Sequence, residues 1–392
     1  MKVAKKLLCF LMAVVMLGSI LTVYGSAVVI IAKNKYPIIL VHGMFGWGAN
    51  EGINDIVPYY GATAGDLVGD MRKKGYDCYS ASVGPLSSVW DQACELYAQL
   101  TGTVVDYGKE HSERCKHARY GEDYTGRALV DSFSEKDKIN LLGHSFGGAT
   151  VRMFATIMAQ GSDAEKAATD AKDLSPYFQG GKGDWIYSVT SLAAPHNGTT
   201  AYCTPEEPAE PAEAEETKAN PFMDVIYGMM DKVMGAPDDG RIATDNADYD
   251  MVIDNALELN KKLPIYKDTY YFSYACSSTE KQEDGTYKAI NSKTEFLFRD
   301  SANEMGRYTG VTEGGYVIDE KWLENDGLVN TISAKAPEFA PSVIFNPQKI
   351  ERGVWNIMPV EHQDHMGFQG GQLIRKDINS LYYNQLDLIN RL

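Results

Sequence analysis

Two apolar runs in the first half of the chain each end in a turn that contains glycine. Residues 36–41 (YPIILV) lead into HGMFG at 42–46, and residues 139–142 (INLL) lead into GHSFG at 143–147. Continuous apolar runs of this kind are typical of strands buried on both faces of a parallel sheet. Residues 148–155 then read as a helix. This order of strand, glycine turn and helix predicts an α/β fold.

The second turn places Ser145 between two glycines, directly after a strand. A sharp strand-to-helix turn strains the serine backbone, and glycine is needed on both sides because a side chain there would collide with the neighbouring strand or helix. The positive N-terminal end of the following helix favours negative charge at the serine. Because a surface loop can spell G-x-S-x-G by chance, the interpretation of Ser145 as a nucleophile depends on the rest of the chain.

A serine nucleophile of this kind works with an oxyanion hole built from backbone N–H groups. In α/β hydrolases one donor is the residue after the nucleophile, and the other lies in a loop that follows an early strand. Here these donors would be Phe146 and Met44. Taken by itself, the run before Met44 is equally compatible with an ordinary strand and glycine turn. Together with the Ser145 turn, it favours an oxyanion hole.

The nucleophile also needs a general base, and the chain has seven histidines. Two of them lie in the turns just described, and three precede any plausible acid in the order serine, acid, histidine that the fold imposes. These five are His42, His144, His111, His117 and His196. His362 and His365 remain, both in a polar loop near the C-terminus. We therefore expect one of these two to be the base.

The best candidate for the acid is Asp326, in the sequence ENDGLV at 324–329. Asn-Asp-Gly is a turn that presents a carboxylate from a loop rather than from a helix face. Asp300 and Asp319 are weaker candidates. For any single aspartate or histidine a solvated loop position is the ordinary alternative, but four elements in the required order favour a serine hydrolase.

Long segments of the chain resemble the thermoalkalophilic bacterial lipases and the related staphylococcal lipases, which are secreted triacylglycerol hydrolases with an α/β-hydrolase fold. The shared segments are 36–48 (YPIILVHGMFGWG), 83–100 (VGPLSSVWDQACELYAQL), 105–121 (VDYGKEHSERCKHARYG), 188–200 (SVTSLAAPHNGTT), 322–331 (WLENDGLVNT) and 353–356 (GVWN).

The resemblance implies roles for particular residues. The family nucleophile falls on Ser145, the acid on Asp326 and the base on His365 rather than His362, with the backbones of Met44 and Phe146 as oxyanion donors. It also implies one α/β-hydrolase domain over residues 33–392. That domain would be a mostly parallel sheet flanked by helices, with a zinc-binding insertion at about 85–125 and a lid insertion at about 201–244.

The resemblance further implies a structural zinc ion, with Asp91, His111, His117 and Asp245 as its ligands. Two histidines six residues apart lie on no common helix face, so the spacing by itself would not have indicated a metal site. Two histidines and two carboxylates make a closed tetrahedral site, which implies a structural role. A different function class, a zinc hydrolase in which His111 and His117 do the chemistry, is a further hypothesis.

The family also binds calcium through carboxylates a few residues after the catalytic histidine. This chain reads MGFQGGQ at 366–372, which contains no acidic residue. Calcium prefers several carboxylate or carbonyl oxygens. Calcium binding is therefore doubtful for this sequence.

The N-terminus and the net charge bear on where the protein acts. Lys2, Lys5 and Lys6 precede an apolar run over residues 7–32, and residues 25–27 (GSA) are small enough for cleavage. This pattern predicts a signal peptide at 1–27 and a secreted protein, with an uncleaved membrane anchor at the outer face as the alternative. The net charge of −16 argues against nucleic acid and anionic membranes as partners. No obligate protein partner is evident.

Residues 204–216 are rich in Pro, Glu and Ala and read as a mobile loop. An apolar stripe at helical spacing follows within 219–236, where the family carries its lid, although such a stripe is most often core packing. We expect a triacylglycerol lipase that acts at an oil–water interface. The alternatives are a carboxylesterase or phospholipase with a reduced lid, because the connection is shorter than in the relatives, and an inactive hydrolase fold that serves as a binding protein.

Overall fold

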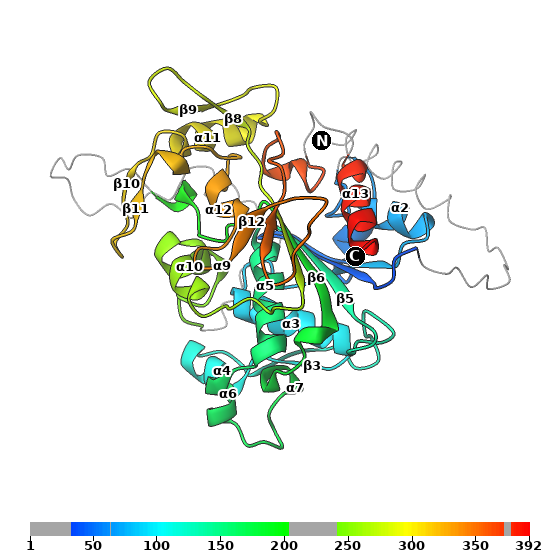
Figure 1. Ribbon diagram of the computed structural model, residues 1–392. Helices are drawn as coiled ribbons and strands as arrows, with labels where there is room; N and C mark the ends of the chain where they lie inside the picture. The colour runs from blue at the N-terminus through cyan, green and yellow to red at the C-terminus, as the bar shows by residue number, and fades with distance from the viewer. Residues whose placement is uncertain (1–32, 63, 204–240, 372–377) are drawn as a thin grey trace, which may run out of the picture. The chain divides into compact units, whose positions relative to one another are not determined.

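The computed structural model describes residues 33–62, 64–203, 241–371 and 378–392, coloured from blue to red in Figure 1. Lys33–Leu392 cluster into one compact unit. The signal peptide expected at 1–27, the loop at 204–216 and the helix expected within 219–236 lie outside the described residues. No helix in the described ranges is long and apolar enough to cross a lipid bilayer.

The centre of the described chain is a seven-stranded parallel sheet in the order β12-β13-β7-β6-β5-β1-β2. The two apolar runs identified in the sequence form β1 and β5, which are neighbours and are buried along their whole length. The predicted α/β fold with a mostly parallel sheet is therefore confirmed. The strands are β1 (Ile38–Val41), β2 (Cys78–Ala81), β5 (Ile139–His144), β6 (Ile186–Leu192), β7 (Tyr270–Tyr274), β12 (Ser342–Ile344) and β13 (Trp355–Ile357).

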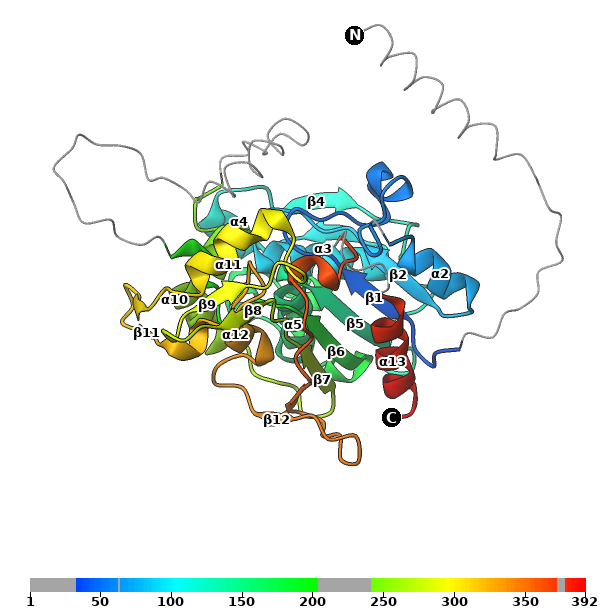
Figure 2. The same cartoon turned by 90° about the horizontal axis from the view of Figure 1, so that it is seen from above.

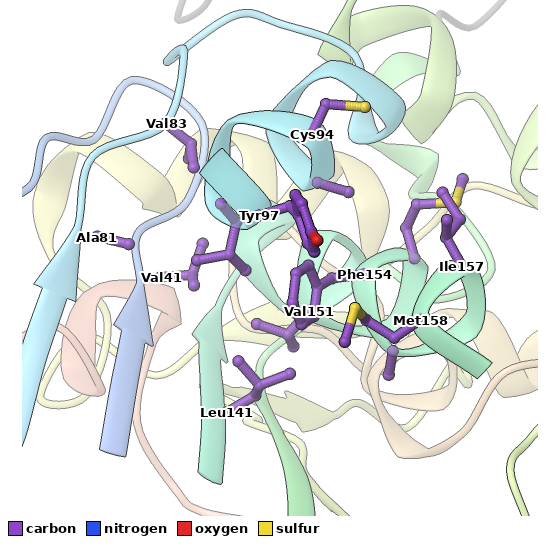
Figure 3. Close-up of a cluster of buried hydrophobic side chains, with 14 of the residues drawn as sticks. Val41, Ala81, Val83, Cys94, Tyr97, Leu141, Val151, Phe154, Ile157 and Met158 are labelled. Atoms are coloured by element: carbon purple, nitrogen blue, oxygen red, sulfur yellow. The ribbon is translucent and has the colours of Figure 1, made fainter. Parts of the chain in front are cut away.

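Helices cover both faces of this sheet, as Figures 1 and 2 show from two directions. One face packs against α3 (Val89–Thr101) and α5 (Phe146–Gln160), and the other against α2 (Leu67–Lys73) and α13 (Asn379–Asn390). Because successive strand side chains point to opposite faces, β1 contributes to both cores. Val41 belongs to the core with α3 and α5, shown in Figure 3, whereas Leu40 packs on the side of α2 and α13.

Shorter elements surround the sheet. The α-helices are α4 (Lys109–Cys115), α6 (Asp163–Ala168), α7 (Pro176–Gln179), α9 (Ala247–Met251), α10 (Ile253–Asn260), α11 (Arg299–Met305) and α12 (Thr331–Lys335). The 3-10 helices are η1 (Gly52–Asp55), η2 (Gly183–Trp185), η3 (Thr200–Tyr202), η4 (Phe296–Phe298), η5 (Glu320–Trp322) and η6 (His365–Gly367). Antiparallel pairs form between β3 (Val104–Asp106) and β4 (Tyr120–Asp123), β8 (Thr279–Lys281) and β9 (Tyr287–Ala289), and β10 (Gly310–Val311) and β11 (Val317–Ile318).

The parallel arrangement decides where functional loops gather. The carboxyl ends of parallel strands lie at one edge of the sheet, and in such folds ligands bind in the loops outside that edge. Residues 42–46 follow β1 at this edge, and Ser145 follows β5 beside them. Two turns that are about a hundred residues apart in sequence are therefore brought together by strand pairing.

Candidate active site and metal centre

Ser145 occupies a strained turn between β5 and α5. Its φ of 56° and ψ of −130° lie outside the ordinary regions for a residue with a side chain. A Cβ on Gly143 would lie 2.1 Å from the carbonyl oxygen of Gly147, and one on Gly147 would lie 2.3 Å from that of His42. The two glycines are therefore required by close backbone contacts, which gives the sequence pattern its physical cause.

The loop after β1 packs directly against this turn. A Cβ on Gly43 would lie 2.6 Å from the Cβ of Ser145. Phe45 has a φ of 61° and donates its amide N–H to the carbonyl of Pro85 at 3.0 Å. Among the described residues, the amide N–H groups of Met44 and Phe146 donate to no acceptor. Two unused donors thus flank Ser145, as an oxyanion hole requires.

The candidate acid and base form a buried pair. The Nδ1 of His365, at the start of η6, lies 3.0 Å from Oδ2 of Asp326. The other oxygen of Asp326 accepts from the backbone N–H groups of Leu328 at 3.0 Å and Val329 at 2.7 Å. Because a carboxylate in this position accepts, the His365 ring carries its proton on Nδ1 and leaves Nε2 free for a neighbouring hydroxyl.

The residues that competed for these roles lie elsewhere. His362 is exposed, although it is only three residues before His365. Asp300 is exposed on α11, and Asp319 caps η5 by accepting from the N–H of Lys321. The structure therefore brings together the set that the resemblance favoured and separates it from these alternatives.

Ser145 and His365 line one cavity with a volume of about 230 Å³. Most of its other lining side chains are apolar or aromatic. They include Met44, Trp47, Tyr202, Met251, Phe298 and Val329. An apolar cavity with a nucleophile and a base at one end is suited to the acyl chain of an ester.

Two further polar residues lie at this centre, and sequence reasoning gave neither a role there. The Nδ1 of His144 lies 2.8 Å from the hydroxyl of Tyr59, and its Nε2 lies 3.0 Å from the carbonyl oxygen of His365. Burial, with a smaller contribution from the nearby His365, lowers the pKa of His144 to about 3. The one available signal was the position of His144 beside the serine, because Tyr59 has no motif around it.

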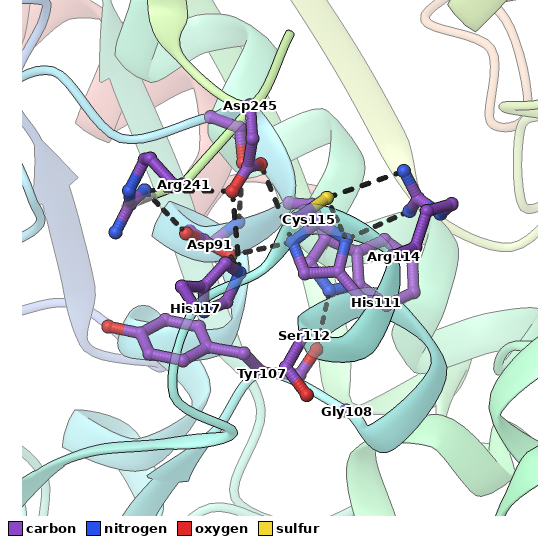
Figure 4. Close-up of polar contacts among 12 residues, drawn as sticks. Asp91, Tyr107, Gly108, His111, Ser112, Arg114, Cys115, His117, Arg241 and Asp245 are labelled. Atoms are coloured by element: carbon purple, nitrogen blue, oxygen red, sulfur yellow. Dashed lines mark hydrogen bonds and ion pairs between the residues drawn. The ribbon is translucent and has the colours of Figure 1, made fainter. Parts of the chain in front are cut away.

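A second cluster of buried polar groups lies beside α3 and α4, as Figure 4 shows. Asp91 stands in the first turn of α3, His111 within α4, His117 just after α4, and Asp245 just before α9. Within the described chain, one ligand-type atom on each of the four is buried without a hydrogen bond: Asp91 Oδ1, His111 Nε2, His117 Nε2 and Asp245 Oδ2. Buried polar atoms without a hydrogen bond are costly, so we expect this cluster to be satisfied by a bound cation.

The spacing of these atoms fits a tetrahedral metal ion. Asp91 Oδ1 lies 3.0 Å from His111 Nε2 and 3.9 Å from His117 Nε2, and Asp245 Oδ2 lies 3.3 Å from His117 Nε2. Nitrogen and oxygen ligands of a tetrahedral zinc, about 2.0–2.2 Å from the ion, lie about 3.3–3.6 Å from one another. The Nδ1 of His117 lies 2.8 Å from the carbonyl of Ala118, which leaves Nε2 as the ligand atom.

Two neighbours complete the surroundings of this cluster. The Nη1 of Arg241 donates to Oδ2 of Asp91 at 3.0 Å, so the outer oxygen of that carboxylate is paired. Cys115 is also near, since its Sγ lies within 4.8 Å of a ligand-type atom on each of His111, His117 and Asp245. It is 3.8 Å from Nδ1 of His111, however, and not from Nε2, the ring nitrogen that contacts the carboxylates. The unpaired atoms therefore favour Asp91 over Cys115 as the fourth ligand.

Comparisons with known sequences identify proteins that this chain is similar to. A family model described as "Lipase-like, C-terminal domain" matches residues 34–206 and 239–386. Lipase 1 of Staphylococcus aureus (strain MRSA252) is 29% identical over 359 residues, which cover 86% of this chain and 51% of the relative. A lipase of Staphylococcus epidermidis is 30% identical over 370 residues, with 86% and 50% covered. The chain spans about half the length of these curated relatives.

Solved structures with the same fold cover nearly the whole chain. EstA from Clostridium botulinum is 32% identical with a TM-score of 0.78, and the match covers 93% of this chain and 90% of that one. Lipase 1 from Pelosinus fermentans is 31% identical with a TM-score of 0.75, covering 92% and 99%. The lipase of Staphylococcus hyicus is 26% identical with a TM-score of 0.77, covering 94% and 98%. On the extent of the family match, the chain belongs to the lipase-like family.

Proposed function

We propose that this protein is a serine hydrolase of carboxylic esters with Ser145 as the nucleophile. The observation that carries the proposal is the buried Asp326–His365 pair, which opens into the same apolar cavity as a serine held in a strained turn. The names of the curated relatives, which are lipases, support the same chemistry.

In the proposed mechanism each residue has a part in acyl transfer. His365 Nε2 takes the Ser145 proton as the serine oxygen attacks the ester carbonyl, and Asp326 holds the imidazole in the productive tautomer. The N–H groups of Met44 and Phe146 bind the oxyanion. Collapse of the tetrahedral intermediate breaks the bond to the alcohol, which takes the proton from His365. Water, activated by the same base, then releases the acid and restores Ser145.

Triacylglycerol at an oil–water interface is the proposed substrate, as in a lipase. A short-chain carboxylesterase is the second candidate, and the cavity favours it. Ligand pockets are commonly about 300–1,000 Å³, and the cavity here, about 230 Å³, has room for one acyl chain of modest length. Export from the cell, by cleavage of the segment at 1–27 or with that segment as an anchor, remains a prediction.

We also propose that Asp91, His111, His117 and Asp245 hold a structural zinc ion. When bound, the metal would supply positive charge to two buried carboxylates and a cross-link between α3, α4 and the segment before α9. The electrostatics support a cation there: burial lowers the pKa of His111, but contacts with Asp245 and Asp91 outweigh it and raise the value to about 8. The four atoms would fill all four positions of a tetrahedral ion and leave none open for water or substrate. The proposed role of the metal is therefore to stabilise the fold rather than to take part in catalysis.

The test is hydrolysis of acyl esters of increasing chain length, together with a triglyceride emulsion and a phospholipid. We expect Ser145→Ala to abolish turnover of every substrate. Ser191→Ala is the matched control, because Ser191 also contacts a buried histidine, His196 at 2.9 Å, but on a strand away from the cavity. Activity unchanged in Ser145→Ala would refute the role of Ser145 as the nucleophile, and no ester hydrolysis by the wild type would refute the proposed function and favour a binding protein.

A further inference from the structure

A chain of three hydrogen bonds joins the two catalytic loops through the residue before the nucleophile. Gly43, beside the proposed oxyanion donor Met44, donates its N–H to the Tyr59 hydroxyl at 2.9 Å. That hydroxyl lies 2.8 Å from His144 Nδ1, and His144 Nε2 lies 3.0 Å from the carbonyl oxygen of His365. The chain starts and ends on backbone groups of catalytic loops that are more than three hundred residues apart in sequence.

The direction of every bond in this chain is fixed by its ends. The carbonyl of His365 can only accept, so Nε2 of His144 carries the hydrogen. At the other end, the amide of Gly43 can only donate, so the Tyr59 oxygen accepts from it. The Tyr59 hydroxyl therefore donates its hydrogen to Nδ1 of His144, which is unprotonated. One neutral tautomer of His144 satisfies all three bonds.

The neutral state of His144 is also what the chemistry needs. The His144 and His365 ring centroids are 5.0 Å apart, and His365 becomes a cation during turnover. Tyr59 faces His144 from the opposite side, and Asp326 lies behind His365. Of these groups, the carboxylate of Asp326 contacts His365 through Oδ2 and makes no hydrogen bond to His144. A charged His144 would oppose formation of the His365 imidazolium, so a histidine kept neutral by burial and by its two bonds serves the reaction.

The same bonds fix where the base stands. No hydrogen bond joins the side chains of Ser145 and His365 in the described structure, so the distance between them is set by how the backbone of His365 is held. Its N–H donates to the carbonyl of Asp326 at 3.0 Å, and its carbonyl is held by His144. A displacement of about 1 Å at a catalytic centre costs roughly a hundredfold in rate.

We propose that His144 and Tyr59 are positioning residues for the hydrolysis, which hold the oxyanion loop at Gly43 and the base His365 in register with Ser145. The inference rests on the proposed function, because it concerns the rate of that reaction. It predicts a fall in kcat when these hydrogen bonds are removed. If Tyr59 and His144 only stabilised the fold, their removal would lower the melting temperature without this effect on kcat.

Tyr59→Phe tests the proposal with the smallest change, since it removes one hydroxyl. Tyr60→Phe is the control: Tyr60 is the adjacent residue, is also buried, and its hydroxyl donates to the carbonyl of Val41 at 2.6 Å. Because the Tyr59 hydroxyl makes two hydrogen bonds, we expect both variants to lower the melting temperature, Tyr59→Phe at least as much as Tyr60→Phe. Tyr59→Phe should also lower kcat by about 10- to 100-fold with little change in KM, and Tyr60→Phe should leave both unchanged.

Variants of His144 provide a second, independent test. The glutamine side chain carries an NH2 donor group and a carbonyl acceptor, so His144→Gln can restore both bonds, whereas His144→Leu restores neither. We expect kcat of His144→Gln to exceed that of His144→Leu by at least about tenfold when both are compared per folded molecule. If His144→Leu does not fold, His144→Gln is compared with wild type, and its kcat should stay within about tenfold of it.

The outcomes separate this inference from the proposed function. If the wild type hydrolyses esters and the Tyr59→Phe and Tyr60→Phe variants have equal kcat, the positioning role is refuted and the proposed function stands. If the wild type hydrolyses no ester, the proposed function itself is refuted, and the inference with it. A low kcat in Tyr59→Phe, together with the stated order of the His144 variants, supports the inference.

Discussion

The protein contains two clusters of buried polar side chains, and they differ in how their hydrogen bonds are completed. At the catalytic centre both oxygens of Asp326 and both ring nitrogens of His144 have protein partners. In the cluster around His111 and His117, four buried ligand-type atoms make no hydrogen bond within the described chain and face mainly one another, at 3.0–3.9 Å. A complete network indicates a site that the chain preorganises by itself, and an incomplete one indicates a ligand that the chain must acquire.

The two clusters also rest on different parts of the fold. Ser145 and the loop after β1 extend from β5 and β1, adjacent strands that each have a neighbour on both sides in the sheet. The metal-type ligands come from the first turn of α3, from α4 and the turn after it, and from a segment before α9. Strand pairing holds the first set in place, whereas the second set depends on short elements at the margin of the fold, where a metal cross-link contributes more.

The largest expected effect concerns the catalytic cluster. We expect His365→Ala to lower kcat for a soluble ester by roughly 10⁴- to 10⁶-fold, because the base is lost while the cavity remains. The melting temperature should change little in comparison. His362→Ala is the control, since His362 is exposed three residues away and should leave kcat unchanged. The reverse result, loss of activity in His362→Ala with activity kept in His365→Ala, would make the assignment of the base wrong.

The next effect concerns the metal cluster. Purified protein should contain zinc by elemental analysis, and removing it by a chelator or by His117→Ala should lower the melting temperature by about 5 °C. This follows because a ligand at a thousandfold excess over its Kd adds about 4 kcal/mol, and each kcal/mol shifts a domain as large as Lys33–Leu392 by roughly 1–2 °C. Cys115→Ser is the control and should keep both zinc and melting temperature.

Two results would contradict the proposed structural zinc site. A protein without zinc, whose His117→Ala variant melts like the wild type, would leave the four unpaired atoms unexplained. Immediate loss of ester hydrolysis on adding chelator, at a temperature where the protein stays folded, would instead favour the zinc hydrolase hypothesis over a structural metal.

A smaller effect should appear in the pH dependence of stability. Burial lowers the pKa of His144 from 6.5 to about 3, so the unfolded chain binds a proton at this residue that the folded chain does not. The stability that depends on the neutral residue is present above pH 6.5 and is lost as the pH falls towards 3. Between pH 7 and pH 5 the wild type should therefore lose about 2 kcal/mol more than His144→Gln.

Urea unfolding at the two pH values measures this difference, because the other histidines are common to both proteins and their contributions cancel. His362→Gln is the control: it removes an exposed histidine and should follow the wild type. Equal losses in the wild type and His144→Gln would show that His144 takes up a proton in the folded protein as readily as in the unfolded chain, contrary to the hydrogen-bond chain.

Much of the fold could be predicted from the sequence because its signals are local. The apolar runs before Gly43 and Ser145 became adjacent buried strands, and the glycines around Ser145 are explained by contacts of 2.1–2.3 Å that a Cβ would make. The choice of His365 over His362 could not be made from spacing, since both lie in one polar loop. The resemblance to known lipases favoured His365, and the structure separates the two residues by burial.

The positioning roles of Tyr59 and His144 could not be predicted from the sequence, for a physical reason. Tyr59 and His144 are 85 residues apart, and His144 and the carbonyl of His365 are 221 apart. Every residue has a backbone carbonyl, so the sequence does not show which residue accepts a hydrogen bond through it. The same holds for the unpaired atoms of the metal cluster, because burial without a partner is a property of the folded chain.

Calcium should have the smallest effect, and the reason lies in the segment after His365. The one carboxylate beside it, Asp364, is already engaged: Oδ1 accepts from the N–H of Met366 at 3.1 Å and Oδ2 from that of Glu295 at 2.8 Å. Residues 366–371 contribute no acidic side chain. We expect added calcium to change the melting temperature of the zinc-loaded protein by less than about 1 °C, since a site with few hard anionic ligands binds it weakly. A rise of several degrees that Asp364→Asn abolishes would show that Asp364 exchanges its backbone partners for the ion.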